Sequence, residues 1–257
     1  MAKSVAKKEE TGMTFSETKP DYIEDSARGQ ENVGMEDVTI PRLDVLQDLS
    51  PQRKKNDPAY IEGAEEGMLF NTVTGELYGE SVFFIPTYYK KEWLIWKQQA
   101  AGGGFNGAFA TEAEASVEYQ EKGYDSETFK KDGVTVPTYE IVDTANHFGL
   151  LVKDDGSIEE ICISMSKSKM KVNRQFNTVV KMAGGDRFSR VYQVSAVEDT
   201  NKANQSFFNL KITSKGYAPE DLYHLGEKMY ESLSSNERKV AHEVPATEAP
   251  STEGEEY

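Results

Sequence analysis

The sequence predicts a β-rich α+β fold in which a basic amphipathic helix lies between strands. Residues 158–165 form an apolar, β-branched run, which is typical of a buried strand. A helical pattern continues over about 167–183, and two strand-like runs follow at 188–197 and 206–214. The predicted order at the centre of the fold is therefore strand, helix, strand, strand.

The predicted helix has local start and stop signals. Ser164 and Ser166 are candidate N-caps, and Gly184 and Gly185 are of the residue type that ends helices. At about 100° per residue the helix has two unlike faces. One face is apolar and the other mainly basic: Val172, Phe176, Val179, Val180 and Ala183 on the first, and Lys167, Lys171, Arg174, Thr178 and Lys181 on the second.

The helix and its flanks are basic, whereas the chain is acidic. From Ser164 to Arg190 there are seven Lys or Arg and one acid, Asp186, although the whole chain has a formal net charge of −15. A solvated helix face would explain such a run, because Lys and Arg are mostly exposed in proteins. The next two strands favour a single-stranded nucleic acid instead, because aromatic and polar or cationic residues share a face on each. These residues are Phe188, Arg190 and Tyr192 on the first strand, and Phe207, Asn209 and Lys211 on the second.

The composition is that of a globular, intracellular protein. Of the 257 residues, 37% are hydrophobic and 11% aromatic, which is enough for a core. The single cysteine, Cys162, lies in an apolar run and is expected to be a small buried hydrophobe rather than a nucleophile. No run reaches the roughly 20 apolar residues of a membrane span, and the first residues lack a signal-peptide core. We therefore expect a cytoplasmic protein with no membrane partner.

The first part of the chain is predicted to have little regular structure. Residues 1–34 show no hydrophobic period and are expected to be a disordered arm. Residues 38–49 are apolar enough to dock on a core. Pro41 makes the preceding residue extended, and a short helical turn with leucines on one side is expected before Ser50.

Two strand signals around a glycine-bearing turn lie within 68–96. The second run, 82–89, is apolar on both faces, and Pro86 places it at a sheet edge or a bulge. A tryptophan in such a strand usually belongs to the core. The aromatic and cationic pattern nevertheless recurs here, at Tyr88, Lys90, Lys91 and Trp93.

The following stretch, 100–107, is rich in glycine but lacks the Lys-Ser/Thr pair and the helix position of a phosphate-binding loop. We therefore expect a flexible connector. A helix is predicted over 111–122, because Thr111 can cap it and Glu114 stands at the capping-box spacing. Its many glutamates make it a solvated helix and a poor DNA contact.

The remaining predicted elements complete one domain over 35–236. Residues 136–142 and 148–152 are expected strands. A short C-terminal helix is expected over 218–236, with a proline in its first turn. Residues 237–257 carry several Glu with Pro and Thr and are predicted to be a disordered acidic tail.

The sequence shows no catalytic or metal-binding motif. Its three histidines lie far apart, without metal-ligand spacing, and it has no nucleophile elbow, zinc-protease motif or dinucleotide fingerprint. Adjacent acids such as Glu159 and Glu160 point to opposite faces of a strand. We therefore expect no enzymatic activity, catalytic residue, metal or cofactor, with a metal-dependent nuclease among the 44 acids as a minor alternative.

Four segments resemble a family of tailed-bacteriophage single-stranded DNA-binding proteins: GMEDVTIPRLDVLQDLSPQ, YIEGAEEGMLFNTVTGELYG, SMSKSKMKVNRQFNTVV and DRFSRVYQVSAVEDTNKANQSFFNLKI. The resemblance covers 34–217 and implies a five-stranded Greek-key barrel of the oligonucleotide-binding (OB) type. Independently, a hairpin followed by strand, helix, strand, strand is compatible with that barrel, whose helix lies between its third and fourth strands. The acidic end also resembles the C-terminal segments of phage and bacterial single-strand binders, although its acids are sparser.

The leading hypothesis is a non-enzymatic protein that binds single-stranded DNA during phage replication or recombination in the infected cell. Replication or recombination proteins would dock on the tail through Glu253, Glu255, Glu256 and Tyr257. The alternative is a phage structural or scaffold-interaction protein with no nucleic-acid role; a homodimer is compatible with either. The expected DNA contacts are Lys167, Lys171, Arg174, Lys181, Arg187, Arg190, Tyr192, Phe207, Lys211, Tyr88, Lys90, Lys91 and Trp93.

Overall fold

The computed structural model describes residues 28–29, 39–131, 133–201 and 204–235. The chain divides into two units, 1–38 and 39–257, and the fold described below is that of the second unit. The predicted acidic tail, 237–257, lies outside the described residues, as does the predicted N-terminal arm apart from a turn at Arg28 and Gly29.

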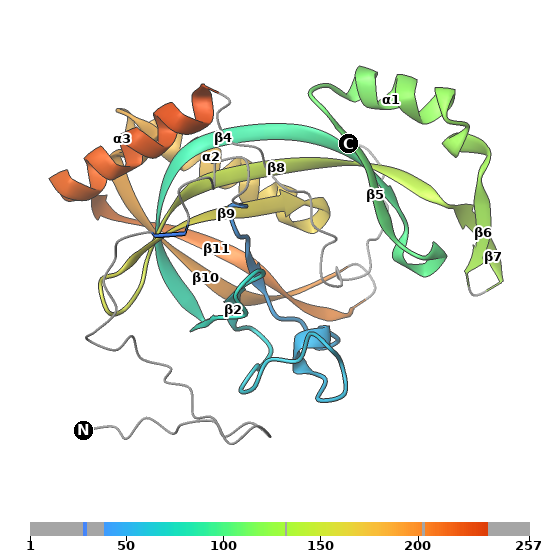
Figure 1. The fold of residues 1–257 in the computed structure, drawn as a ribbon, viewed down its shortest axis with the longest axis horizontal. Helices are drawn as coiled ribbons and strands as arrows, with labels where there is room; N and C mark the ends of the chain where they lie inside the picture. The colour runs from blue at the N-terminus through green and yellow to red at the C-terminus, as the bar shows by residue number, and fades with distance from the viewer. Residues whose placement is uncertain (1–27, 30–38, 132, 202–203, 236–257) are drawn as a thin grey trace. The chain divides into compact units, whose positions relative to one another are not determined.

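The fold is β-rich with few helices, as predicted (Figure 1). The strands are β1 (Leu43–Val45), β2 (Leu69–Asn71), β3 (Leu77–Gly79), β4 (Ser81–Lys97), β5 (Gly104–Phe109), β6 (Thr128–Lys131), β7 (Val134–Pro137), β8 (Tyr139–Val152), β9 (Ile158–Ser166), β10 (Arg190–Thr200) and β11 (Ser206–Tyr217). The α-helices are α1 (Glu112–Glu121), α2 (Met170–Ala183) and α3 (Glu220–Ser234). Short 3-10 turns are η2 (Pro51–Arg53), η3 (Gln99–Ala101), η4 (Tyr124–Ser126), η5 (Lys167–Lys169) and η6 (Arg187–Ser189).

The largest sheet is antiparallel and six-stranded, in the order β11-β10-β4-β8-β9, with β5 paired to the far part of β4. Strands β10, β4, β8 and β9 lie in Greek-key order, because the chain returns through α2 to place β10 beside β4. The insertion between β4 and β8 holds β5, α1, β6 and β7. Figure 1 shows this insertion at the end of the β4–β8 ribbon away from α3.

Strand β4 is central to the sheet and 17 residues long. Its pairing with β8 shifts register between Pro86 and Tyr88, which confirms the predicted bulge. Opposite Pro86 lies Gly149, where a Cβ atom would be 2.2 Å from the carbonyl oxygen of Ile85. Only a glycine allows the two strands to approach this closely at the bulge.

The two faces of the sheet have separate cores. Neighbouring residues of β4, β8 and β9 point to opposite cores, as strand alternation requires. The core beneath α2 includes Phe84, Leu151, Ile163, Phe176 and Tyr192. The core beneath α3 includes Ile85, Phe148, Leu150, Cys162 and Met229. Cys162 is fully buried, as predicted, and this burial raises the pKa of its thiol to about 12.

The sheet does not close into the predicted barrel, because β9 and β11 are its two ends and do not pair with each other. The segment 41–47 links these ends. The N–H of Cys162 on β9 donates to the carbonyl of Pro41 at 2.8 Å. On β11, the Gln47 side chain donates to the carbonyl of Phe208 and accepts from its N–H, both at 2.8 Å. A side-chain amide therefore takes the place of a paired strand residue.

Several local predictions are wrong. The expected helical turn within 38–49 is instead strand β1, which pairs with β2 in a separate three-stranded sheet. The Gly-rich stretch 100–107 is more than a connector, because β5 begins within it and pairs with β4. Residues 136–142 and 148–152 do not form two strands, since β8 runs unbroken through most of both. The hairpin of β6 and β7 was not predicted.

The helices follow the predictions more closely. Thr111 and Glu114 form the predicted capping box of α1, and Pro219 immediately precedes α3. Helix α2 begins at Met170, after the turn η5, and its N-cap residue is Lys169. Neither predicted serine therefore caps α2.

Candidate nucleic-acid interface

The basic residues around α2 fall into two groups, and the first is held by the protein itself. Lys167 Nζ lies 2.8 Å from Glu140 Oε1, and Lys169 Nζ lies 2.8 Å from Asp44 Oδ1. An acid at this distance competes with a phosphate for the lysine. The predicted phosphate contact Lys167 is thus already in an ion pair.

Arg187, also a predicted phosphate contact, is partly buried and held by neighbouring side chains. Its Nη2 donates to Nδ1 of His147 at 2.7 Å and to Oδ1 of Asn177 at 3.1 Å. The guanidinium lies 5.3 Å from the ring centroid of Tyr89 and 5.7 Å from that of Phe176. Burial lowers the pKa of Arg187 to about 10, so it stays charged at neutral pH. Its charge faces protein groups rather than solvent, and it is not placed to hold DNA.

His147 completes this buried cluster. Burial, followed by the nearby Arg187 charge, lowers the pKa of His147 to about 3, so the ring is neutral at neutral pH. Because Nδ1 accepts from Arg187, Nε2 carries the proton and donates to Oδ1 of Asn173 at 2.8 Å. Asn177 Nδ2 donates to the same oxygen at 3.0 Å. We call His147, Asn173, Asn177 and Arg187 the His–Arg cluster; it fixes α2 against β8.

The second group of basic residues is exposed. None of its members forms an ion pair with any residue that the structure describes. We call this group the four exposed cations. They are Lys171, Arg174 and Lys181 on α2 and Lys211 on β11.

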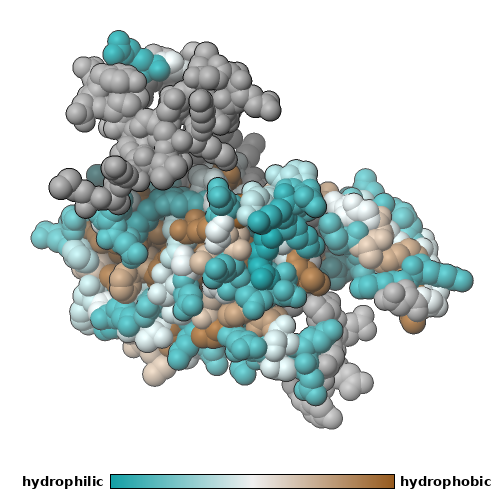
Figure 2. Space-filling model, turned by 90° about the horizontal axis from the view of Figure 1, so that it is seen from below, coloured by the Kyte–Doolittle hydropathy of each residue, from teal (hydrophilic) through white to brown (hydrophobic). Residues whose placement is uncertain are grey.

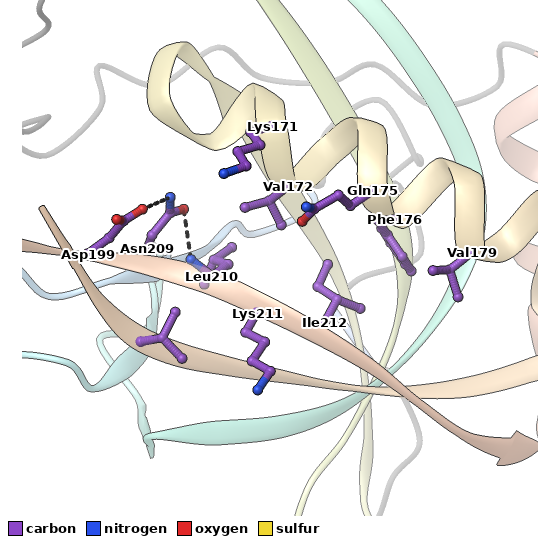
Figure 3. A pocket seen from close by; sticks show the side chains of 11 residues that line it. Lys171, Val172, Gln175, Phe176, Val179, Asp199, Asn209, Leu210, Lys211 and Ile212 are labelled. Atoms are coloured by element: carbon purple, nitrogen blue, oxygen red, sulfur yellow. Dashed lines mark hydrogen bonds between the residues drawn. The ribbon is translucent and has the colours of Figure 1, made fainter. Parts of the chain in front are cut away.

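A groove of about 360 Å³ lies between α2 and the strands β10 and β11, of which β11 is an end strand of the sheet (Figure 3). Lys171 lines it from the helix and Lys211 from β11, although Figure 3 shows the Lys211 side chain directed away from α2. Asp199 lies at one end, where its carboxylate accepts from Asn209 Nδ2 at 3.2 Å. The groove thus combines two lysines and one acid with an apolar lining. The apolar lining includes Val172, Phe176, Val179, Val197, Leu210 and Ile212.

The predicted aromatic platforms on β10 and β11 differ in exposure. Tyr192 is 1% exposed and packs edge-on against Phe176, with 5.1 Å between ring centroids. A base cannot stack on a ring without a free face, so Tyr192 belongs to the core. Phe207 is half-buried on β11. Arg190 is engaged by Tyr217, with a 3.0 Å hydrogen bond to its hydroxyl and 4.2 Å to its ring centroid.

Two of the predicted contacts on β4 are held by neighbouring residues. Tyr88 lies beneath α3, 6.2 Å from Tyr230 by ring centroids. Lys90 is exposed but lies 2.6 Å from the carboxylate of Glu92, which is 4% exposed. Neither contributes to the groove beside α2.

The other two contacts on β4 form a pair of their own. Lys91 Nζ lies 4.5 Å from the ring centroid of Trp93 and 3.2 Å from a carboxylate oxygen of Asp143. The indole is partly exposed, but a lysine already covers one part of it. This pair is separate from the lining of the groove.

The remaining predictions concern the C-terminal tail, metal binding and the membrane. The tail residues, Glu253 to Tyr257 among them, lie outside the described residues. Within the described ranges, no three His, Cys, Asp or Glu are grouped to hold a metal ion. No helix in those ranges is long and apolar enough to cross a membrane. On the face shown in Figure 2, hydrophilic residues surround small groups of apolar ones.

Sequence reasoning missed the polar side chains that organise this region. Asn173 and Asn177 are four residues apart on the inner side of α2, and this spacing was an available signal. Nothing local indicated that Asn173 would bond to His147 on β8, or Asn177 to Arg187. Gln47 likewise gave no signal of its contact with β11.

The fold and the groove define an antiparallel β-sheet protein with a basic, apolar-lined groove at one sheet edge. The chain belongs to the Pam3 phage gp34-like protein family, which matches residues 8–239. It is therefore a bacteriophage protein, as the resemblance to phage sequences implied. Comparison with curated proteins and with solved structures finds no match.

Proposed function

We propose that this protein binds single-stranded DNA without enzymatic activity and supports phage DNA replication or recombination in the cytoplasm of the infected cell. The observation that carries the proposal is the group of four exposed cations on α2 and β11, two of the elements that line an apolar groove, in a chain of net charge −15. Phosphate neutralisation supplies most of the affinity for nucleic acids. The apolar lining of the groove suits bases that are not paired in a duplex.

The strand order supports the same proposal. The OB fold is a partly open, five-stranded Greek-key barrel, with its helix between the third and fourth strands. Here β4, β8, β9, β10 and β11 follow this order, with α2 between β9 and β10. In this interpretation the fold is an OB-like barrel held partly open by the segment 41–47 and enlarged by the insertion between β4 and β8. Because a fold does not imply a function, the proposal depends on the groove.

The distribution of charge favours one strand over two. The negative field of the whole chain opposes a duplex, which carries twice the phosphate charge. Phosphates are expected beside Lys171 and Lys211, with bases on the apolar floor between them. Arg174 and Lys181 would continue the phosphate path along α2.

The test is fluorescence anisotropy with a labelled single-stranded oligonucleotide over a series of salt concentrations. Reversing Lys171 and Arg174 to Glu should weaken binding and reduce the salt slope by about 0.7 for each lost phosphate contact. The matched control reverses two exposed lysines, Lys122 at the C-cap of α1 and Lys228 on α3, which changes the net charge equally. Only the first pair should alter the slope.

Two outcomes would overturn the proposal. The first is the absence of single-strand binding at low salt. The second is an equal loss of affinity in both charge-reversed proteins, which would show a general effect of net charge. A duplex competitor that displaces the oligonucleotide as well as a single strand does would remove the preference for single strands.

A structural or scaffold-interaction role is the second candidate. It is favoured by apolar residues that are exposed on the insertion between β4 and β8: Phe105 at 38%, Val117 at 56% and Val134 at 62%. An interface with another protein would bury these exposed apolar side chains. A protein partner that binds this insertion, together with no affinity for DNA, would favour this candidate. The nuclease alternative receives no support from the described acids.

A further inference from the structure

The outer edge of β11 presents backbone groups that β10 does not use. β11 is an end strand of its sheet, and alternate residues of such a strand point N–H and C=O away from the sheet. Phe208 is one of these residues, because both its backbone groups bond to Gln47. By alternation, the backbone N–H and C=O groups of Leu210 and Ile212 also point away from β10. The Leu210 N–H donates to Oδ1 of Asn209 at 2.8 Å, and Ile212 follows with both its groups on this edge.

The groove between α2 and β11 runs beside this edge. Residues 209–212 of β11 line it on one side, and Val172, Gln175 and Val179 of α2 line it on the other (Figure 3). An extended peptide adds to an exposed strand edge through main-chain hydrogen bonds, while alternate side chains enter pockets. This groove offers both elements, an edge and an apolar floor.

The protein already uses this edge in the same manner. The Gln47 amide makes with Phe208 the two hydrogen bonds that a paired strand residue would make. Its contact ends just before the groove begins at Asn209. A peptide strand lying in the groove would therefore continue the pairing from the point where Gln47 leaves it.

We propose that an extended, acidic peptide segment of a partner protein adds to β11 in this groove as a further strand. Charge complementarity selects an acidic peptide, because the groove lining carries two lysines, Lys171 and Lys211, and one acid, Asp199, and is therefore net positive. Apolar residues at alternate positions would meet the floor, and carboxylates between them would reach the lysines. Such a peptide competes with DNA for the same lysines; this competition alone rests on the proposed function.

The probe is a fluorescein-labelled, seven-residue peptide of alternating Val and Glu, titrated into the full chain by anisotropy. Two methylated versions carry N-methyl groups on either the odd or the even residues, so each loses the N–H groups along one edge of the strand. Only the version methylated on the edge facing β11 should lose affinity, by at least about tenfold, as expected for more than one lost hydrogen bond. A Val–Lys peptide should bind at least about tenfold more weakly, because like charges repel.

A variant of β11 tests the same contact from the protein side. Ile212→Pro removes the outward N–H, and proline is tolerated where that N–H faces away from the sheet. Ile212→Ala is the matched control, because it shortens the side chain but keeps the N–H. The proline variant should bind the Val–Glu peptide about tenfold more weakly than the alanine variant. If the proline variant fails to fold, the methylated peptides still decide the question.

The peptide and oligonucleotide titrations distinguish strand addition, competition with DNA and the proposed function. Equal binding of both methylated peptides, or no saturable binding of the Val–Glu peptide, overturns strand addition. Binding that depends on the methylated edge but does not displace a labelled oligonucleotide keeps strand addition and overturns the competition. An oligonucleotide that does not bind at all overturns the proposed function, while the peptide measurements still test strand addition.

Discussion

Arg174 and Arg187 belong to the same basic segment of sequence but occupy opposite environments. Arg187 is enclosed by His147, Asn177 and two aromatic rings. Arg174 is exposed on α2 and forms no ion pair with a described residue. The comparison shows that a basic run does not assign one role to its members. Side chains from distant strands decide which cation stabilises the fold and which is open to a ligand.

The largest effect is expected from Tyr192→Ala, which removes the aromatic ring beside the His–Arg cluster. Because Tyr192 is 1% exposed, the change should cost about 3 to 5 kcal/mol of unfolding free energy. Denaturant unfolding measures this, and DNA affinity of the folded fraction should stay unchanged. Phe207→Ala is the half-buried comparison and should cost less. A loss of DNA affinity at unchanged stability would show that Tyr192 is a DNA contact rather than a core residue.

Replacing each arginine by methionine tests the comparison directly. Arg187→Met leaves Nδ1 of the fully buried His147 without its donor, and an unsatisfied buried polar group costs about 1 to 3 kcal/mol of unfolding free energy. Arg174→Met should change stability by no more than about 0.5 kcal/mol but should weaken DNA binding. Thermal unfolding and anisotropy of both variants give the result. Equal destabilisation would contradict the assigned roles.

The His–Arg cluster should also make stability depend on pH. The pKa of His147 is lowered to about 3 in the folded state from an ordinary value of 6.5. Between these values the unfolded state binds the proton and the folded state does not, so stability should fall as pH falls from 6.5 toward 3. Between these pH values, the change of unfolding free energy with pH should approach the value expected when the unfolded state binds one more proton than the folded state. His147→Gln should flatten this limb of a pH series of denaturant unfolding, whereas His224→Gln, at an exposed position, should leave it intact.

The smallest effect on stability is expected from deleting residues 237–257. This removes several glutamates from a chain whose four exposed cations we propose as the DNA contacts. Single-strand affinity should rise, most at low salt, because the Debye length shortens from about 30 Å at 0.01 M to about 8 Å at 0.15 M. The melting temperature should stay nearly unchanged. Equal affinities at low salt would show that these acids do not compete with DNA.

The sequence predicted the features that local patterns determine. The capping box at Thr111, the bulge after Pro86 and the burial of Cys162 are confirmed. Strand β1 was mistaken for a helical turn because three residues are too few to establish a period. The short strands β6 and β7 pair only with each other and carry little apolar pattern, so they were missed.

The site was predictable only in part, for a related reason. Helical periodicity correctly placed Lys171, Arg174 and Lys181 on the exposed side of α2. It could not place Arg187, which follows the helix and meets a histidine 40 residues earlier in the chain. Phe188 and Tyr192 were expected on one face, but the turn η6 sends Phe188 to the other core. Contacts between distant elements carry no local signature in the sequence.

The contact between Gln47 and Phe208 joins residues 161 positions apart, and this separation has a consequence for the rate of folding. Joining such distant positions costs loop-closure entropy before the contact can stabilise the fold. Folding therefore slows as the sequence separation of contacting residues grows. We expect the segment 41–47 to dock late, after β10 and β11 have formed their hairpin. Until then both ends of the sheet are open to pairing with other chains. Refolding yield should therefore fall as protein concentration rises, and more steeply when Gln47 is replaced by alanine.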